Sequence, residues 1–207
     1  MGKKYELTEE TKEFYGRTLY RIKALKDFGD VEVGDLGGYI ESESNLMQEG
    51  CAWVYGNAMV YGSARVCDNA KVCDNAEVHA NAMVYGSAKV CDNAKVYGDA
   101  MVLGSADVCG SANVYGSANV YGYADVRGDA EIKGKTDYIV FKNWWSSGRY
   151  FTWTRSNNMW KVGYFYGTGK ELVEKAYKDS ELSGREYERV VKYVESILAD
   201  EKKQRKQ

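Results

Sequence analysis

Three of the five cysteines, Cys73, Cys91 and Cys109, follow one another at a fixed spacing of eighteen residues. Thiolates bind soft metals, but tetrahedral zinc needs converging ligands, and no Cys-x-x-Cys pair or histidine cluster accompanies these thiols. An odd number of cysteines inside a repeat does not make a disulfide framework. We therefore expect five reduced thiols, with the three spaced ones as a ladder of small polarizable side chains, and neither a metal nor a cofactor.

His79 is the only histidine, and an imidazole is the commonest general base in enzymes. It shares the eighteen-residue spacing with Tyr61, Tyr97 and Tyr115, so it is also one member of a regular aromatic column. This position favours a structural role, and we assign no catalytic residue from the spacing alone.

The stretch NWWSSGRYFTWTR, from Asn143 to Arg155, interleaves aromatic rings with hydroxyls and arginines. The rings could stack on a nucleobase, and the serines and arginines could hold phosphate. The candidate ligand-binding residues are Trp144, Trp145, Ser147, Arg149, Tyr150, Trp153 and Arg155, with Ser146 beside them. Strand alternation puts Phe151 and Trp153 opposite Tyr150, so only part of the set can be exposed. The competing interpretation is that these aromatic residues form the core of a small domain.

The cysteines and His79 lie within a six-residue sequence repeat that runs from residue 54 to residue 136. Each unit reads Ala-x-Val-x followed by a turn pair such as Gly-Ser or Asp-Asn, and fourteen units run without an insertion. Inward Ala and Val that alternate with outward residues have the period of a strand, and the turn pairs would break a helix at every unit. The chain contains no proline, which suits strands that donate every N–H to a ladder. The pattern predicts a stacked solenoid of short parallel strands.

Outward residues repeat in type every eighteen positions, which predicts three strands in each coil and a triangular prism with three unlike faces. One face is apolar through its middle, where it carries Met83, Tyr85, Met101, Leu103 and Tyr121. An exposed apolar patch usually meets another surface. We expect these five residues to form a subunit interface, with cover by the chain's own tail as the alternative.

The units VYGSAR and VCDNAK resemble the hexapeptide repeat, whose family forms left-handed parallel β-helices and commonly trimers. The flanking segments TLYRIKALKDFGDVEVGDLGGYIESESNL, SSGRYFTWTRSNNMWKVGYFYGT and GREYERVVKYVESIL look like those of uncharacterised hexapeptide-repeat proteins of phages and prophages. The resemblance implies one enzymatic alternative, an acyltransferase that uses acyl-coenzyme A with His79 as its base. Against this activity, no loop leaves the coils, whereas such acyltransferases generally carry one. Hexapeptide carbonic anhydrases need three histidines, which this chain lacks.

The predicted fold is mainly β: a left-handed parallel β-helix with three strands per coil, an N-terminal β cap and a C-terminal α+β cap. The expected boundaries are 1–35 for the N-terminal cap, 36–136 for the β-helix and 137–207 for the α+β domain. Two capping boxes, Thr168 with Glu171 and Ser183 with Glu186, are expected to open two helices in the last part. The second helix has one apolar stripe, made of Tyr187, Val190, Val191, Val194, Ile197 and Leu198.

Charge separates the chain into chemically different parts within a net charge of −2. Residues 1–132 carry twelve basic and twenty acidic side chains, whereas residues 133–207 carry sixteen basic and ten acidic ones. The basic part suits an anionic partner. No run of about 18 apolar residues and no charged-then-apolar leader occurs, so we expect a cytoplasmic protein, in the host cell if a phage encodes it.

These observations favour a non-catalytic accessory protein of a phage or prophage. We expect a rigid oligomeric scaffold, favoured as a trimer, that sequesters a small anionic ligand such as a host-defence nucleotide signal or blocks a host protein. Neither a membrane nor a long nucleic acid is an expected partner. The alternative is the hexapeptide-repeat acyltransferase.

Overall fold

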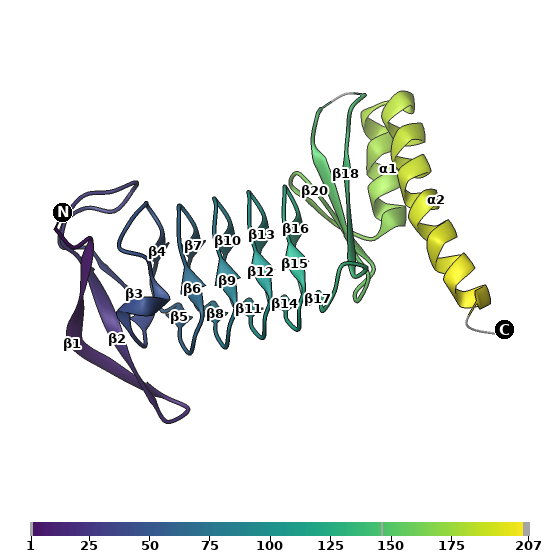
Figure 1. The fold of residues 1–207 in the computed structure, drawn as a ribbon. Helices are drawn as coiled ribbons and strands as arrows, with labels where there is room; N and C mark the ends of the chain where they lie inside the picture. Colours follow the sequence, from purple (N-terminus) through teal and green to yellow (C-terminus); the bar gives the residue numbers. More distant parts are fainter. Residues whose placement is uncertain (1, 146, 205–207) are drawn as a thin grey trace. The chain divides into compact units, whose positions relative to one another are not determined.

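Each six-residue unit of the repeat forms one two-residue strand and one corner. The computed structural model describes residues 2–145 and 147–204, and their contacts divide it into two units (Figure 1). The first unit comprises Met1–Tyr138 with Thr154–Asn157, and the second comprises Ile139–Trp153 with Asn158–Gln207.

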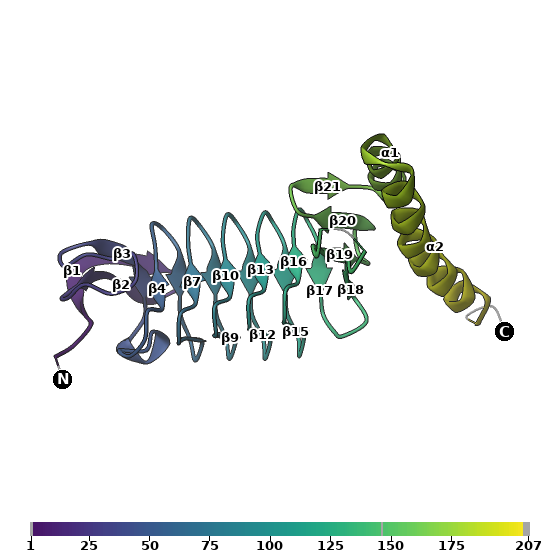
Figure 2. The same cartoon turned by 90° about the horizontal axis from the view of Figure 1, so that it is seen from above.

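The strands of the first unit stack into the three faces of a parallel β-solenoid (Figure 2). One face contains β4 (Trp53–Val54), β7 (Lys71–Val72), β10 (Lys89–Val90), β13 (Asp107–Val108) and β16 (Asp125–Val126). The second contains β6 (Arg65–Val66), β9 (Met83–Val84), β12 (Met101–Val102) and β15 (Asn119–Val120). The third contains β5 (Met59–Val60), β8 (Glu77–Val78), β11 (Lys95–Val96), β14 (Asn113–Val114) and β17 (Glu131–Ile132). Strands eighteen residues apart pair in register, which confirms three strands per coil.

The interior of the prism consists of the alanine and valine positions of the repeat. From Ala58 to Ile132 these inward side chains are at most 1% exposed, as the alternation predicted. Backbone N–H groups donate up the stack, for example from Lys89 to the Ala106 carbonyl at 2.9 Å. One coil buries too little apolar surface to offset its ordering entropy, so each coil depends on its neighbours.

The corners require residues that tolerate positive φ. At Gly86 (φ 72°) a side chain would come within 2.9 Å of the backbone of Gly104 in the next coil, which only glycine avoids. Aspartate takes this place in the Asp-Asn units and adds a hydrogen bond. The Asp92 carboxylate, for example, accepts the Gly110 N–H of the next coil at 2.8 Å, which holds the two corners together.

An antiparallel hairpin extends one face at the N-terminal end. It consists of β1 (Tyr5–Phe14) and β2 (Arg17–Ala24), and β2 pairs with β3 (Leu36–Ile40), which lies parallel to β5. A short 3₁₀ helix, η1 (Glu43–Asn45), then leads into the coils. The hairpin therefore covers a strand edge that would otherwise recruit other chains.

Lys4 lies buried beside the first coil. Its ammonium donates to the Ala52 carbonyl at 2.9 Å and lies 5.1 Å from the centre of the Phe28 ring. Burial lowers the pKa of Lys4 to about 8, because the interior disfavours the charged form.

The second unit packs two helices on a sheet with the order β18-β19-β20-β21. The strands are β18 (Tyr138–Lys142), β19 (Tyr150–Thr154), β20 (Met159–Val162) and β21 (Phe165–Gly167), followed by α1 (Gly169–Asp179) and α2 (Glu181–Gln204). Phe151, Trp160, Leu172 and Val191 share one core cluster, which joins the helices to the sheet. In the described residues, neither helix has an apolar stretch that could cross a membrane.

The first predicted capping box is confirmed, and the second is wrong. Thr168 and Glu171 cap α1 reciprocally. The second helix begins before Ser183, because the Ser180 hydroxyl already accepts the Ser183 N–H at 3.1 Å and starts the helix at Glu181. The apolar stripe is confirmed, since Val191 and Val194 are buried and the others are partly covered.

The prediction of five reduced thiols is also wrong. A disulfide joins Cys91 to Cys109, whereas Cys51, Cys67 and Cys73 are free. In-register stacking places equivalent residues of successive coils one strand spacing apart, and these two Cα atoms are separated by 4.7 Å. That separation lies within the range that a disulfide spans.

Candidate functional site

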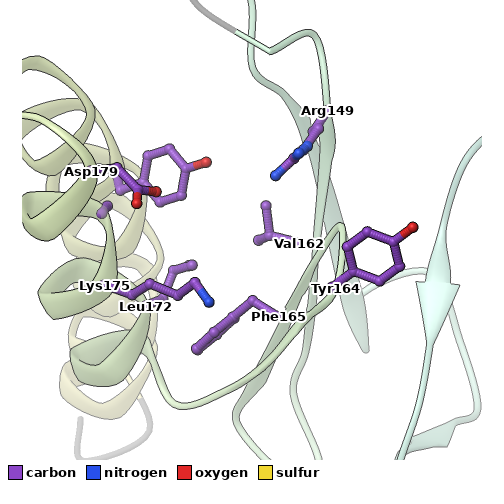
Figure 3. A pocket seen from close by; sticks show the side chains of 9 residues that line it. Arg149, Val162, Tyr164, Phe165, Leu172, Lys175 and Asp179 are labelled. Carbon is purple, nitrogen blue, oxygen red and sulfur yellow. The ribbon is translucent and has the colours of Figure 1, made fainter.

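A cavity of about 130 Å³ lies in the second unit between the sheet and α1 (Figure 3). The polar side chains around it are Arg149, Tyr164, Lys175, Asp179 and Tyr187. Val162 and Leu172 supply an apolar floor and are buried themselves. The cavity thus combines charged groups at its rim with apolar surface beneath, as small-molecule sites commonly do.

Backbone geometry positions the charged groups. Arg149 stands immediately before β19, and its side chain lies over Gly163, where an added Cβ would meet the guanidinium at 3.4 Å. Gly163 has φ 54° in the turn between β20 and β21, so glycine suits both the turn and the arginine above it. Lys175 and Asp179 are four residues apart on α1 and therefore share the helix face that borders the cavity.

Among the described residues, the three charged side chains at the rim have no side-chain partners. Within residues 2–145 and 147–204, no ion pair or side-chain hydrogen bond engages the Arg149 guanidinium, the Lys175 ammonium or the Asp179 carboxylate. Two cations at one rim favour the binding of an anion. The Asp179 carboxylate can accept a hydrogen bond from an amine or a hydroxyl group of the same ligand. Chemically, the cavity is suited to binding a small anionic or zwitterionic group.

The structure corrects the prediction that Trp153 stacks on a ligand. Trp153 is 1% exposed, and its indole N–H donates to the Asn158 side chain at 2.9 Å. Phe151 on the same strand is fully buried. The two rings form core, because the strand turns this side towards the helices.

Two further predicted residues have mainly local roles. Trp145 packs against Phe151 and Tyr187, with ring centres 6.0 and 6.1 Å apart, so it also belongs largely to the core. The Ser147 hydroxyl accepts from the Asn143 amide at 3.2 Å and orders its own loop. Ser146 lies outside the described residues.

The remaining predicted residues are partly available to solvent. Trp144 is 83% exposed, and the Tyr150 ring lies 5.8 Å from the Lys142 ammonium. Arg155 belongs to the first unit, where its Nε donates to the Thr136 carbonyl at 2.9 Å. Of the predicted set, Arg149 is the described residue that lines the cavity.

Sequence reasoning missed Tyr164, Lys175, Asp179 and Tyr187. The available signal was the spacing of Lys175 and Asp179, which share one face of α1 with Leu172 and Ala176, two further residues that line the cavity. That signal is weak, because charged pairs four residues apart are common on exposed helix faces.

His79 is one layer of a stacked aromatic column. Its ring lies between Tyr61 and Tyr97, with centres 4.9 and 5.1 Å apart and planes within 3° of parallel. The stack continues from Tyr97 to Tyr115 at 5.2 Å. Burial lowers the pKa of His79, so the imidazole is neutral at pH 7. Both ring faces are occupied, which leaves only the ring edge for chemistry.

The predicted interface residues do share one face. Met83 and Met101 lie on β9 and β12, and Tyr85 and Leu103 follow these strands directly. These four are half-buried, and Tyr121 after β15 is 60% exposed. Their role in assembly stays a prediction.

Comparison with known proteins relates part of the solenoid to one repeat. Residues 52–68 match the family model of the YdcK beta solenoid repeat. The chain is 39% identical over 61 residues to a protein of Escherichia coli (strain K12) named "Uncharacterized acetyltransferase YdcK". The match covers 26% of this chain and 19% of that protein, so the chain spans about a fifth of the relative's length. Residues 52–68 of the solenoid are therefore similar to a β-solenoid repeat of the YdcK type.

Proposed function

We propose that the protein is a non-catalytic binding scaffold whose C-terminal α+β unit holds a small anionic ligand. The observation that carries this proposal is a pair of cations, Arg149 and Lys175, that have no partner in the described part of the chain and lie at one cavity with an apolar floor. The excess of basic side chains in residues 133–207 supports it, because a positive region concentrates anions near the site.

Cavity size limits the ligand. A volume of about 130 Å³ is close to that of an engineered cavity of roughly 150 Å³ that binds benzene. A phosphate or carboxylate with a few further atoms fits, whereas a whole nucleotide would leave its base outside. In the sharper form of the proposal, a phage or prophage accessory protein in the host cytoplasm sequesters a nucleotide signal by its phosphate.

Calorimetry with inorganic phosphate, cyclic nucleotides and small carboxylates tests this proposal. Loss of a charge-assisted hydrogen bond costs about 1.5–3 kcal/mol, so Arg149→Ala and Lys175→Ala should each weaken binding by roughly 10- to 100-fold. Lys178→Ala is the matched control, since Lys178 is exposed on α1 and does not line the cavity. Binding should weaken with added salt, and the ligand should be recovered unchanged. Equal losses in all three variants, or no binding by any of these anions, would contradict the proposal.

Acyl transfer is the second candidate function. Two observations favour it: the partial relative carries the name of an acetyltransferase, and the neutral His79 has the protonation state of a base. Acetyl-coenzyme A turnover that disappears in His79→Ala would support this candidate over a binding scaffold. Binding of a ligand that is recovered intact in both proteins would favour the scaffold.

We further propose a homo-oligomer, with a trimer favoured, that assembles through Met83, Tyr85, Met101, Leu103 and Tyr121. A half-exposed apolar face on a rigid solenoid supports this assembly. A host protein is the alternative partner to the small anionic ligand.

A further inference from the structure

Three cysteines form a straight column on one face of the solenoid. Cys73, Cys91 and Cys109 each directly follow a strand, β7, β10 and β13, and these strands pair in register. The Sγ atoms of Cys73 and Cys91 and a carboxylate oxygen of Asp74 all lie within 4.8 Å of one another. The same holds one coil further for Cys91, Asp92 and Cys109.

The spacing of this column suits a particular coordination geometry. Sulfur atoms in a line cannot surround a tetrahedral ion, which counts against zinc. Soft monovalent copper is stable with two thiolates on opposite sides. With a metal–thiolate bond of about 2.3 Å, as for zinc, the two sulfurs lie about 4.6 Å apart. This separation matches the spacing of successive coils, for which the Cα atoms of Cys91 and Cys109 are 4.7 Å apart.

We propose that the reduced cysteine column is a binding site for a soft monovalent cation of the copper(I) type. The ion lies between Cys91 and a neighbouring cysteine, with the carboxylate of Asp74 or Asp92 beside it. Cys91 is the shared ligand, because it has a cysteine on either side. Cys91 and Cys109 are only 5% and 2% exposed, and such burial shields a bound copper(I) ion from water and oxygen.

Ion binding and the observed disulfide exclude each other. A dithiol donates two electrons and two protons to the Cys91–Cys109 bond, which gives two protein thiols and oxidises the dithiol to its own disulfide. Copper(I) then replaces the two thiol protons, which are released to solvent. The oxidised chain keeps only Cys73 as a free thiol in the column, so it has lost the pair of ligands.

The test is a titration of the full-length protein with copper(I) in oxygen-free buffer, against a coloured copper(I) chelator. The protein is first reduced with excess dithiothreitol, which is then removed. We expect one tightly bound ion per chain and no displacement by an equal amount of zinc(II). Air-oxidised protein of the same sequence should bind at least about 100-fold more weakly, and this comparison needs no substitution.

Two variants locate the site. Cys91→Ser should lower the affinity at least about 100-fold, because it removes the shared sulfur. Cys67→Ser is the control, since Cys67 is a half-buried free thiol, like Cys73, but lies on another face, outside the column. Wild-type affinity in Cys91→Ser, or equal affinity of the oxidised and reduced proteins, would overturn the proposal. If Cys91→Ser does not fold by circular dichroism, the oxidised–reduced comparison decides alone.

Discussion

The strongest test of the solenoid compares the same substitution at two adjacent positions of β10. Val90 is fully buried between Val72 and Val108 of the neighbouring coils, whereas Lys89 points outward and is exposed. Asparagine replaces each in turn. It already occupies the outward position of a strand at Asn113, so Lys89→Asn reproduces a pattern that the fold accepts.

The expected magnitudes follow from burial. Val90→Asn forfeits about 1.5–3 kcal/mol of valine burial, and it leaves an amide without partners in the prism at a further cost of about 1–3 kcal/mol. The sum of roughly 2.5–6 kcal/mol is a large part of the stability of a typical domain. It corresponds to a fall in melting temperature of about 10–20 °C for a unit of this size. Lys89→Asn should change stability by less than about 0.5 kcal/mol.

Thermal unfolding followed by far-ultraviolet circular dichroism measures both variants against the parent protein. Hydrogen exchange at the Lys71 and Asp107 amides, in the strands on either side of β10, should be faster in Val90→Asn than in the parent protein. The reason is that the loss of stability spreads to the adjacent coils. Similar shifts for Val90→Asn and Lys89→Asn would refute the assignment of inward and outward positions.

Three further predictions concern assembly, the N-terminal cap and the helix pair. Light scattering should show that Met101→Lys with Leu103→Lys converts the oligomer to monomer; a monomeric parent protein would contradict the proposed interface. Burial lowers the pKa of Lys4 from 10.5 to about 8 in the folded protein. Between these two pH values the unfolded chain binds more protons than the folded one, so the free energy of unfolding should rise with pH. The rise from this group is at most about 3 kcal/mol. Denaturant unfolding at pH 7 and 10 should show this rise in the parent protein relative to Lys4→Met, and parallel behaviour of the two would refute it. Gly184→Ala should destabilise the second unit by about 1–3 kcal/mol despite alanine's higher helix propensity, because its Cβ would lie 2.2 Å from the Tyr177 ring. The double variant with Tyr177→Ala should recover that loss in a thermal melt, and a stabilised single variant would show that the ring moves away freely.

Most of the solenoid could be predicted from the sequence because its contacts are periodic. Val90 meets Val72 and Val108 at a fixed separation of eighteen residues, so one repeated pattern states the strand, the register and the buried face together. The same regularity placed His79 correctly in a column with Tyr61 and Tyr97.

The α+β unit has no sequence repeat. Its cavity is formed by segments that are distant in the sequence and pack against one another in the fold. Arg149 and Lys175 line one cavity only because α1 packs on the sheet that follows Arg149. Local alternation left open which side of β19 would face the helices, and the tertiary structure buried Trp153. Each of these outcomes depends on side chains that meet from separate elements, which no local pattern encodes.

The cysteine column shows both kinds of information in one place. The sequence by itself determined that Cys73, Cys91 and Cys109 lie above one another, because a six-residue repeat with three strands per coil permits no other register. Only the tertiary structure decided that a sulfur–sulfur bond joins Cys91 to Cys109, and that Asp74 and Asp92 place carboxylates beside the sulfurs. Covalent and coordinate bonds depend on side-chain rotamers over a few ångströms, whereas the repeat fixes only the backbone on which those rotamers stand.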